Sequence, residues 1–312
     1  MGAHQPHREP TKRLNAVRAV SAMSSSCDPE RTQSAGALNR AGVPFHTSAP
    51  GQVSIVMWIV PYPESRPICV NAEGDETVTT ASLPLLEYVP DSVWLKEHPL
   101  TLMGGAIRTR MTVLRLDGGL CLHSPVMIDD STREDIEKLG KVIALVAPSN
   151  CHHLYFTSAQ QAFPRARTFG TVDVQRKRKD LRFDEIISDE PPSCWRGQMD
   201  QVFVGNRVMR EVDFLHRASR TLVAVDLVEN FSNLTAGTNN VLRAMLTVLG
   251  MWGRPRPAPE LRWFTRDRVT ARKALERILA WDFKRAVIAH GDLLNRSPHD
   301  AIREAWQWLL RA

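Results

Sequence analysis

The sequence predicts an α+β fold in which β-sheets stack on one another and helices flank them. Three observations predict it: a hairpin signal near residue 117, apolar strands that end in polar residues, and helical patterns between the later strands. Hairpins come first along the chain and mixed strands and helices come later. A simple doubly wound parallel sheet does not fit that order.

Strands are predicted where apolar runs or alternating patterns are bounded by turn residues. Asp117-Gly-Gly119 lies between two such runs, and Asp-Gly in that setting is a strong hairpin signal. Residues 211–215 alternate in polarity as a half-buried strand does. The predicted strands are 111–116, 120–124, 141–147, 211–215, 221–225 and 285–289.

Helices are predicted from their 3.6-residue spacing and from capping residues. Ser131-Thr-Arg-Glu134 is a capping box, and Gly140 ends the helix that it opens. Ser297 caps the last helix, with Pro298 in the first turn. The other predicted helices are 152–163, 239–251 and 268–281, and Arg254-Pro-Arg-Pro-Ala-Pro259 is predicted to be an extended linker.

Residues 1–80 are predicted to form a mostly disordered extension that precedes one domain over residues 81–312. Residues 1–50 lack hydrophobic periodicity and are rich in Ser, Ala, Arg and Pro. Residues 1–26 carry four basic side chains against the single acid Glu9. An organelle-targeting peptide is one interpretation of this segment, and a plain tail or an overextended start is the other.

Composition narrows the class of protein. The chain has 312 residues, of which 43% are hydrophobic and 24% are charged, which is typical of a soluble globular protein. No run of 18 apolar residues predicts a membrane span. The five cysteines have no Cys-x-x-Cys spacing, which favours a reducing, cytoplasmic location. The net charge is +6, but basic and aromatic residues do not interleave, so a small-molecule substrate is expected rather than nucleic acid.

Polar residues follow three of the predicted strands where each strand ends, and α/β proteins place ligands and catalytic groups at such ends. These residues are Asn150, His152 and His153 after the first strand, Asp226 after the second, and His290 with Asp292 after the third. Three such strand ends predict one site built from distant segments.

Each of these residues has a site role and a structural alternative. His152 can ligate a metal through one ring nitrogen, or it can be a helix-start histidine bonded to backbone carbonyls. Its neighbour His153 points elsewhere, so one ring can ligate while the other packs. Asn150 is predicted to cap the helix that begins near residue 152. Asp226 ends an apolar strand, where a carboxylate must be paired or metal-bound, or else anchors a loop.

The remaining candidates are weaker. Asp292 can hold the imidazole of His290 as a supporting carboxylate, or it can simply turn the chain. His216 and His123 also lie at strand ends, and a structural role is favoured over a site role for both. Ser124 precedes a proline and has no nucleophile elbow around it, so a structural role is predicted for it.

Several short motifs between residues 93 and 231 occur together in one known family. They are Val93-Trp-Leu-Lys-Glu-His-Pro, Thr109-Arg-Met-Thr-Val-Leu-Arg-Leu, Leu122-His-Ser-Pro125, Ala147-Pro-Ser-Asn-Cys-His-His153, Phe163-Pro-Arg-Ala166, Glu211-Val and Ser219-Arg-Thr-Leu-Val-Ala-Val-Asp-Leu227. With them the chain resembles domain-of-unknown-function family 4336, which is related to the metallo-β-lactamase superfamily. The resemblance covers residues 83–310 and implies an αββα sandwich with its site along one edge of the two sheets.

The metal motif of active superfamily members is only partly present. Those members carry His-x-His-x-Asp-His after a strand, and this chain has Asn150 in place of the first His and His152 in place of the second. Leu154 and Tyr155 stand where the Asp and the third His would follow. The resemblance therefore implies a broken two-metal set.

Later residues match the rest of the superfamily's ligands. Asp226 matches the bridging Asp, and His290 matches the final His. His216 is the candidate for the middle His, although it lies close to Asp226 in sequence.

The resemblance implies a metallo-hydrolase-like protein with a degenerate metal motif. His152, Asp226 and His290 would hold one divalent ion (zinc, iron or manganese), with His216 as a fourth ligand, and Asp226 would orient the reactive water. Four further residues would contact and orient these ligands: Asn150, His153, Asp292 and His123. The alternative is a catalytically inactive binding or scaffold module on the same fold.

Overall fold

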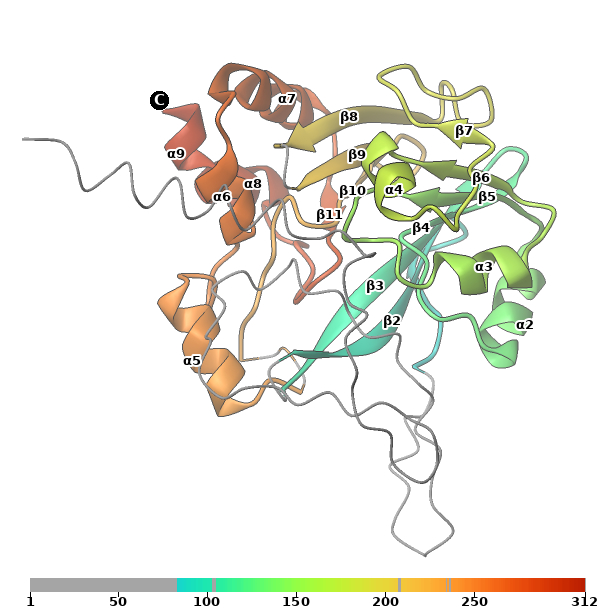
Figure 1. Ribbon diagram of the computed structural model, residues 1–312, viewed down its shortest axis with the longest axis horizontal. Coiled ribbons are helices and arrows are strands. Elements are labelled where there is room, and N and C mark those ends of the chain that lie inside the picture. Colours follow the sequence, from blue (N-terminus) through green and yellow to red (C-terminus); the bar gives the residue numbers. More distant parts are fainter. Residues whose placement is uncertain (1–82, 103–104, 207–208, 234, 236, 312) are drawn as a thin grey trace, which may run out of the picture. The chain divides into compact units, whose positions relative to one another are not determined.

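The strands form two mixed β-sheets (Figure 1). The computed structural model describes residues 83–311, except 103–104, 207–208, 234 and 236. The extension predicted over residues 1–80, with its targeting segment 1–26, lies outside the described residues. The strands of the first sheet are β1 Leu86–Val89, β2 Val93–Leu102, β3 Gly105–Leu116, β4 Gly119–His123, β5 Val142–Ala147, β6 Arg167–Gly170 and β7 Glu185–Ile186. Those of the second are β8 Met199–Gly205, β9 Arg210–His216, β10 Thr221–Val223 and β11 Arg285–Val287.

The first sheet changes from antiparallel to parallel along the chain. Its strands lie in sequence order from β1 to β7, with antiparallel pairs up to β4 and parallel pairs from β4 onward. The predicted hairpin is confirmed, because Leu116 pairs with Gly119 across the turn. Gly119 has a φ of 143°, and a Cβ there would lie 2.3 Å from the carbonyl oxygen of Lys141. Only glycine fits this turn.

The second sheet has the order β11-β10-β9-β8 among the described strands. The strands β8, β9 and β10 pair antiparallel, whereas β10 and β11 pair parallel. Parallel pairing directs the ends of β10 and β11 to the same edge of the sheet. This edge carries the residues that follow both strands.

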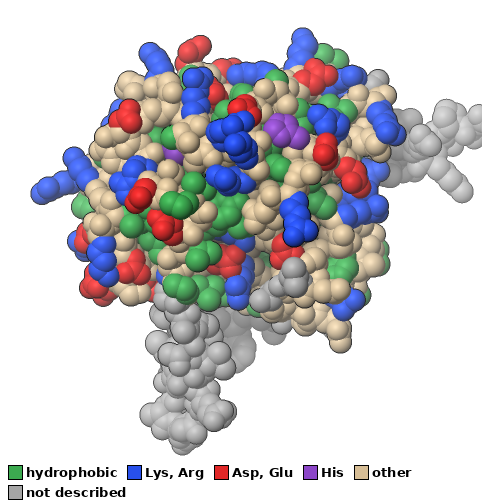
Figure 2. Space-filling model, turned by 180° about the vertical axis from the view of Figure 1, so that it is seen from behind, with side chains coloured by type: hydrophobic (Ala, Val, Ile, Leu, Met, Phe, Trp, Pro, Cys, Tyr) green, Lys and Arg blue, Asp and Glu red, His purple; other side chains and the backbone are tan. Residues whose placement is uncertain are grey.

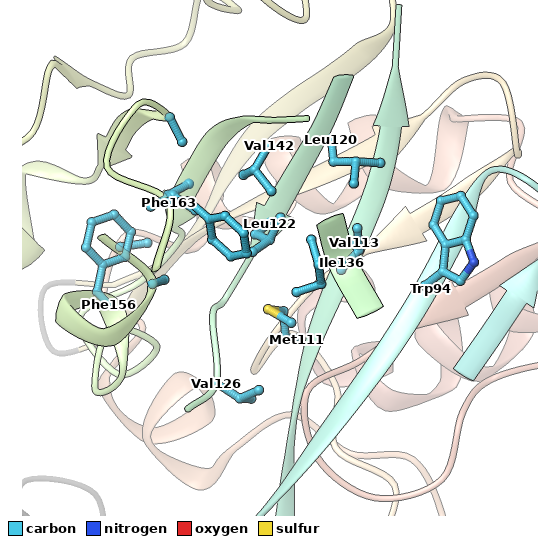
Figure 3. Close-up of a cluster of buried hydrophobic side chains, with 14 of the residues drawn as sticks. Trp94, Met111, Val113, Leu120, Leu122, Val126, Ile136, Val142, Phe156 and Phe163 are labelled. Carbon is cyan, nitrogen blue, oxygen red and sulfur yellow. The ribbon is translucent and has the colours of Figure 1, made fainter. Parts of the chain in front are cut away.

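Alternation along the strands creates two hydrophobic cores. Leu120 and Leu122 of β4 point to one face of the first sheet, where they pack in the cluster of Figure 3. Cys121, between them, points to the opposite face. There it joins Phe214 of β9 and Val287 of β11 in a core that lies between the two sheets. Both faces of the first sheet are therefore buried.

Helices cover the outer faces. Ile136, Phe156 and Val174, from three helices, pack in the outer cluster of the first sheet. Another helix, α7, lies against β8 of the second sheet (Figure 1). The described helices are α2 Asp130–Leu139, α3 Phe156–Ala162, α4 Val172–Lys177, α5 Asn240–Val248, α6 Pro259–Phe264, α7 Arg268–Ala280, α8 Pro298–Ala305 and α9 Gln307–Leu310. The predicted αββα sandwich is confirmed.

The predicted N-cap of α2 is wrong, whereas that of α8 lies at the predicted residue. The cap of α2 is Asp129, whose carboxylate accepts from the N–H of Thr132 at 2.8 Å, so Ser131 lies inside the helix. Ser297 is the N-cap residue of α8 as predicted, with Pro298 in the first turn, although its side chain makes no capping hydrogen bond. Gly140 ends α2 as predicted.

The surface of the described part carries both signs of charge. On the face shown in Figure 2, basic side chains in blue are interspersed with acidic ones in red. Within residues 83–311, no helix is both long enough and apolar enough to cross a bilayer.

Candidate metal centre

Three distant segments meet at one edge of the sandwich and bring together His152, Asp226 and His290. One ligand atom from each side chain lies within 4.8 Å of those from the other two. The Nε2 of His152 is 3.2 Å from Oδ1 of Asp226, and the Nε2 of His290 is 3.8 Å from the same oxygen. All three side chains are buried. Two imidazoles and one carboxylate form a donor set that suits zinc and related divalent ions.

Backbone pairing beyond the strands positions two of these residues. After β10 and β11 end, the N–H of Ala289 still donates to the carbonyl of Val225, which keeps the two segments side by side. Asp226 and His290 are the next residues of these segments. The buried guanidinium of Arg110 donates to the carbonyls of Ile288 and Gly291 and so fixes the segment that carries His290.

The hydrogen bonding of His290 determines which ring nitrogen can bind a cation. Its Nδ1 is 2.9 Å from the carbonyl oxygen of Arg108, and a carbonyl only accepts, so Nδ1 carries the proton. Burial and the neighbouring His152 lower the pKa of His290 to about 4, so the ring is neutral near pH 7. Its Nε2 therefore directs a lone pair toward the carboxylate of Asp226. A cation between Nε2 of His290 and the carboxylate of Asp226 would stabilise these two electron-pair donors beside each other.

Ser124 orients the other imidazole. Its hydroxyl is 2.9 Å from Nδ1 of His152, and a hydroxyl can either donate or accept. When it accepts, Nδ1 carries the proton and Nε2 is left to coordinate a metal. Ser124 has a left-handed backbone with a φ of 53°, and its N–H donates to the carbonyl of Val146. Such strained backbone is concentrated at functional sites. Ser124 was predicted to have a structural role, and in the structure its hydroxyl contacts the candidate ligand His152.

We expect Ser124→Ala to weaken the binding of Zn²⁺ by about 10- to 100-fold, because the ring of His152 loses the partner that fixes its tautomer. Competition against a chromophoric chelator measures this affinity. Ser158→Ala is the control, since the hydroxyl of Ser158 bonds the backbone of Ile128 instead. Equal affinities in the two variants would contradict the role of Ser124.

Four buried carboxylates beside Asp226 were missed in the sequence. They are Glu211, Asp213, Glu229 and Glu260, each 5% exposed or less. Burial raises the pKa of all four, and the charge of Asp226 raises it further. Glu211 also accepts a hydrogen bond from the backbone N–H of Asp226 at 2.6 Å. The alternation of residues 211–215 could have pointed to two of them. It correctly predicted a strand, but it does not show that the carboxylates of this strand are buried.

Burial controls the protonation of this carboxylate cluster. Burial and neighbouring carboxylates raise the pKa values of Glu211 and Glu229 well above the usual range. Neither carboxylate oxygen of Glu229 has a hydrogen-bond partner among the described residues, and neither does Oδ2 of Asp226. Asp226 behaves differently: burial raises its pKa, but His152 and His290 outweigh burial and hold the pKa below its ordinary value. Buried carboxyl oxygens without partners favour a cation beside them, because a cation stabilises their ionised form.

The structure does not bring His216 into this group. His216 pairs with Thr221, the first residue of β10, whereas Asp226 follows the other end of that strand. Its Nδ1 bonds the hydroxyl of Ser219 at 2.7 Å, and its Nε2 bonds the carbonyl of Arg115 at 2.9 Å. The ring is thus held by other protein groups, away from the three converging residues.

Two of the predicted supporting residues lie close in sequence to His152. Asn150 does not cap α3, which begins only at Phe156 after Tyr155; its carbonyl accepts from Lys177 Nζ at 2.8 Å. The Nδ1 of His153 accepts from the guanidinium of Arg178 at 3.2 Å. Neither residue belongs to the three that converge.

The other two predicted supporting residues differ in position. Asp292 accepts from the hydroxyl of Ser232 and donates its N–H to the carbonyl of Asn230 at 2.7 Å, so it shapes the turn instead of holding His290. His123 packs edge-on against Phe214, with ring centroids 5.4 Å apart. Burial and the nearby His152 lower the pKa of His123 to about 3. His123 therefore lies beside the group as a neutral ring.

Comparison with known proteins shows the fold of the chain. No family model and no curated protein matches it, so the narrower resemblance to family 4336 stays a prediction.

Solved structures of metallo-β-lactamases are similar to this chain. DIM-1 exposed to ceftazidime is 11% identical, with a TM-score of 0.52 over 73% of this chain and 98% of its own. VMB-1 is 11% identical, with a TM-score of 0.50 over 72% and 96%. FIM-1 from Pseudomonas aeruginosa, in a mono-zinc form, is 12% identical, with a TM-score of 0.49 over 74% and 98%. From the similarity to DIM-1 and VMB-1, the chain has a metallo-β-lactamase-like fold.

Proposed function

We propose that this protein is a hydrolase that binds one divalent metal ion through His152, Asp226 and His290. The observation that carries the proposal is the convergence of three buried donor atoms within 4.8 Å of one another. Bound in such a site, a divalent ion lowers the pKa of a coordinated water and makes it a nucleophile near neutral pH. The substrate class is an ester, an amide or a phosphoester.

The chain's own residues prepare this site in three ways. The carbonyl of Arg108 and the hydroxyl of Ser124 orient the two imidazoles, so that both Nε2 atoms face Asp226. Three protein ligands leave a coordination position for water, as in catalytic zinc sites. Oδ2 of Asp226 has no partner among the described residues and can accept a hydrogen bond from that water.

The neighbouring carboxylates also support a cation at this site. Burial and the charge of Asp226 raise the pKa values of Glu211, Glu229 and Glu260, and a divalent ion beside Asp226 would offset the cost of ionising them. Carboxylates also bind harder ions such as manganese and iron, so these remain candidates along with zinc.

An inactive binding module on the same fold is the second candidate. Leu154 and Tyr155 support it, because they stand where the resemblance places an Asp and a His. The low exposure of His152 and His290, 7% and 2%, also favours it, since a substrate must reach the ligands.

Metal content and hydrolysis together test the proposal. We expect about one zinc, iron or manganese ion per chain by inductively coupled plasma mass spectrometry, and none in His290→Ala. His216→Gln is the matched control, a buried histidine outside the group that should leave the metal in place. Metal-loaded protein should hydrolyse at least one member of a panel of nitrophenyl esters, anilides and phosphodiesters.

The outcomes separate the two candidates. A wild-type protein that takes up no metal after reconstitution would overturn metal binding by this group. A protein that holds one ion lost in His290→Ala, yet hydrolyses no member of the panel, would favour the binding module.

A further inference from the structure

A cavity of about 340 Å³ is lined by residues of α6, α8 and α9 and of the segment between α5 and α6. Four arginines line it, and the lining includes no acidic side chain. These arginines are Arg254, Arg256, Arg262 and Arg311. Its volume lies within the range of small-molecule sites. A concave surface with this excess of guanidinium groups attracts an anion.

The arginines have few competing partners. Among the described residues, none of the four forms an ion pair with a carboxylate within 4.0 Å, although several other arginines of this chain do. Burial, Arg254 and Arg262 lower the pKa of Arg256, and Glu304, which does not line the cavity, partly offsets them; the positive groups therefore lie close enough to repel one another. An anionic ligand would relieve this repulsion and form charge-assisted hydrogen bonds.

The backbone that presents two of these arginines is stiff. The backbone of Arg256 pairs in both directions with that of Glu229, at 2.7 and 2.9 Å. Prolines stand at positions 255, 257 and 259, so the chain between the arginines has restricted φ angles. The segment that the sequence predicted as an extended linker therefore holds Arg254 and Arg256 in fixed places, which reduces the entropic cost of binding.

Two tryptophans complete the wall. Trp263 lines the cavity and is 56% exposed, which is unusual for so large an apolar side chain. Trp308 also lines it, and its indole N–H has no acceptor among the described residues. Indole faces stack on flat rings and on nucleobases in particular. The wall thus offers an aromatic surface beside the guanidinium groups.

We propose that this cavity binds a phosphorylated small molecule with an aromatic ring, of the nucleotide class. The phosphate would pair with Arg256 and Arg262, and the ring would stack on Trp263. The proposal does not depend on the metal centre, because none of the three converging residues lines the cavity.

Isothermal titration of the full chain with AMP, adenosine and inorganic phosphate tests the proposal. We expect AMP to bind more tightly than either fragment. Arg256→Gln and Arg262→Gln should each raise the Kd for AMP about tenfold or more, because each removes a charge-assisted hydrogen bond. Trp263→Ala should weaken AMP binding and leave phosphate binding unchanged. Arg266→Gln is the matched control, since Arg266 is exposed and does not line the cavity.

Two further measurements locate the bound AMP and check the folding of the variants. His290→Ala should bind AMP like the wild type, which would place binding away from the metal centre. Circular dichroism should show that the arginine variants fold, and Arg262, which is exposed, can be changed with least risk to folding. The proposal is overturned if AMP does not bind, or if Arg256→Gln and Arg262→Gln both bind AMP as tightly as Arg266→Gln does. It is also overturned if a thymidine oligonucleotide binds to these arginines more tightly than AMP does.

Discussion

Replacing Asp226 by asparagine is expected to abolish stoichiometric binding of a divalent metal ion. Asp226 supplies the carboxylate that faces the Nε2 atoms of both His152 and His290. Asparagine has nearly the same shape but no charge, and its amide is a poor ligand for zinc. The loss should exceed the roughly 10- to 100-fold that changing a supporting group costs. Metal content after dialysis against a chelator measures it.

Asp292→Asn is the control for this experiment. Asp292 lies two residues from His290, but its carboxylate bonds Ser232 and not the imidazole, so its replacement should leave the metal bound. One tightly held ion per chain in Asp226→Asn would contradict the assignment of the centre.

Glu229→Gln is expected to stabilise the metal-free protein increasingly as pH rises. Burial and the charges of Asp226 and Glu260 raise the pKa of Glu229 well above the usual range, whereas the unfolded chain has the ordinary value of about 4.3. Between these two values the folded protein holds a proton that the unfolded chain has released. The folded state therefore loses stability as pH rises, by up to about 1.4 kcal/mol per pH unit for this one group. Glutamine keeps the shape and cannot ionise.

Urea unfolding at pH 5 and pH 8, in the presence of a chelator, measures this effect. The variant and the wild type should differ more in unfolding free energy at the higher pH. Glu276→Gln on α7, an exposed residue paired with Arg272, should show no such divergence. Parallel pH dependences of wild type and Glu229→Gln would mean that Glu229 does not bind the additional proton.

The candidate ligands that the sequence predicted share one physical feature. Asp226 and His290 lie three residues beyond the ends of buried strands whose parallel pairing places these ends at one edge. Apolar runs with polar ends are local patterns, so they can be recognised without knowing the fold. The order of hairpins and later helices predicted stacked sheets flanked by helices. The αββα order with its site at one edge came from the resemblance, because alternation such as that of Leu120, Cys121 and Leu122 shows two buried faces but not what covers each of them.

The errors also have physical causes. His216 was assigned from the resemblance, although the predicted strand 221–225 already separates it from Asp226; in the structure it pairs with Thr221, at the other end of β10 from Asp226. Alternation in β9 predicted that Glu211 and Asp213 share a face, but a period of two cannot say whether that face meets water. Their burial arises from tertiary packing.

The helix predicted to begin at His152 is wrong at its start, because local hydrogen bonds compete with helix formation there. The hydroxyl of Ser149 accepts from the N–H groups of Cys151 and His152. Such bonds between a side chain and nearby backbone replace the first turn of a helix. Helix α3 then begins only at Phe156, and His152 stays in a loop that reaches the centre.

The position of the metal centre also bears on the order in which the protein folds and binds its metal. His152 follows a strand of the seven-stranded sheet, whereas Asp226 and His290 follow strands of the other sheet, and 74 residues separate His152 from Asp226. Contacts between such distant segments form late in folding, because the loops between them must close first. An ion in this place would act as a cross-link between the two sheets, added once the sandwich exists. The protein would then acquire its metal as a folded molecule, unlike small zinc domains, whose chains fold around the ion.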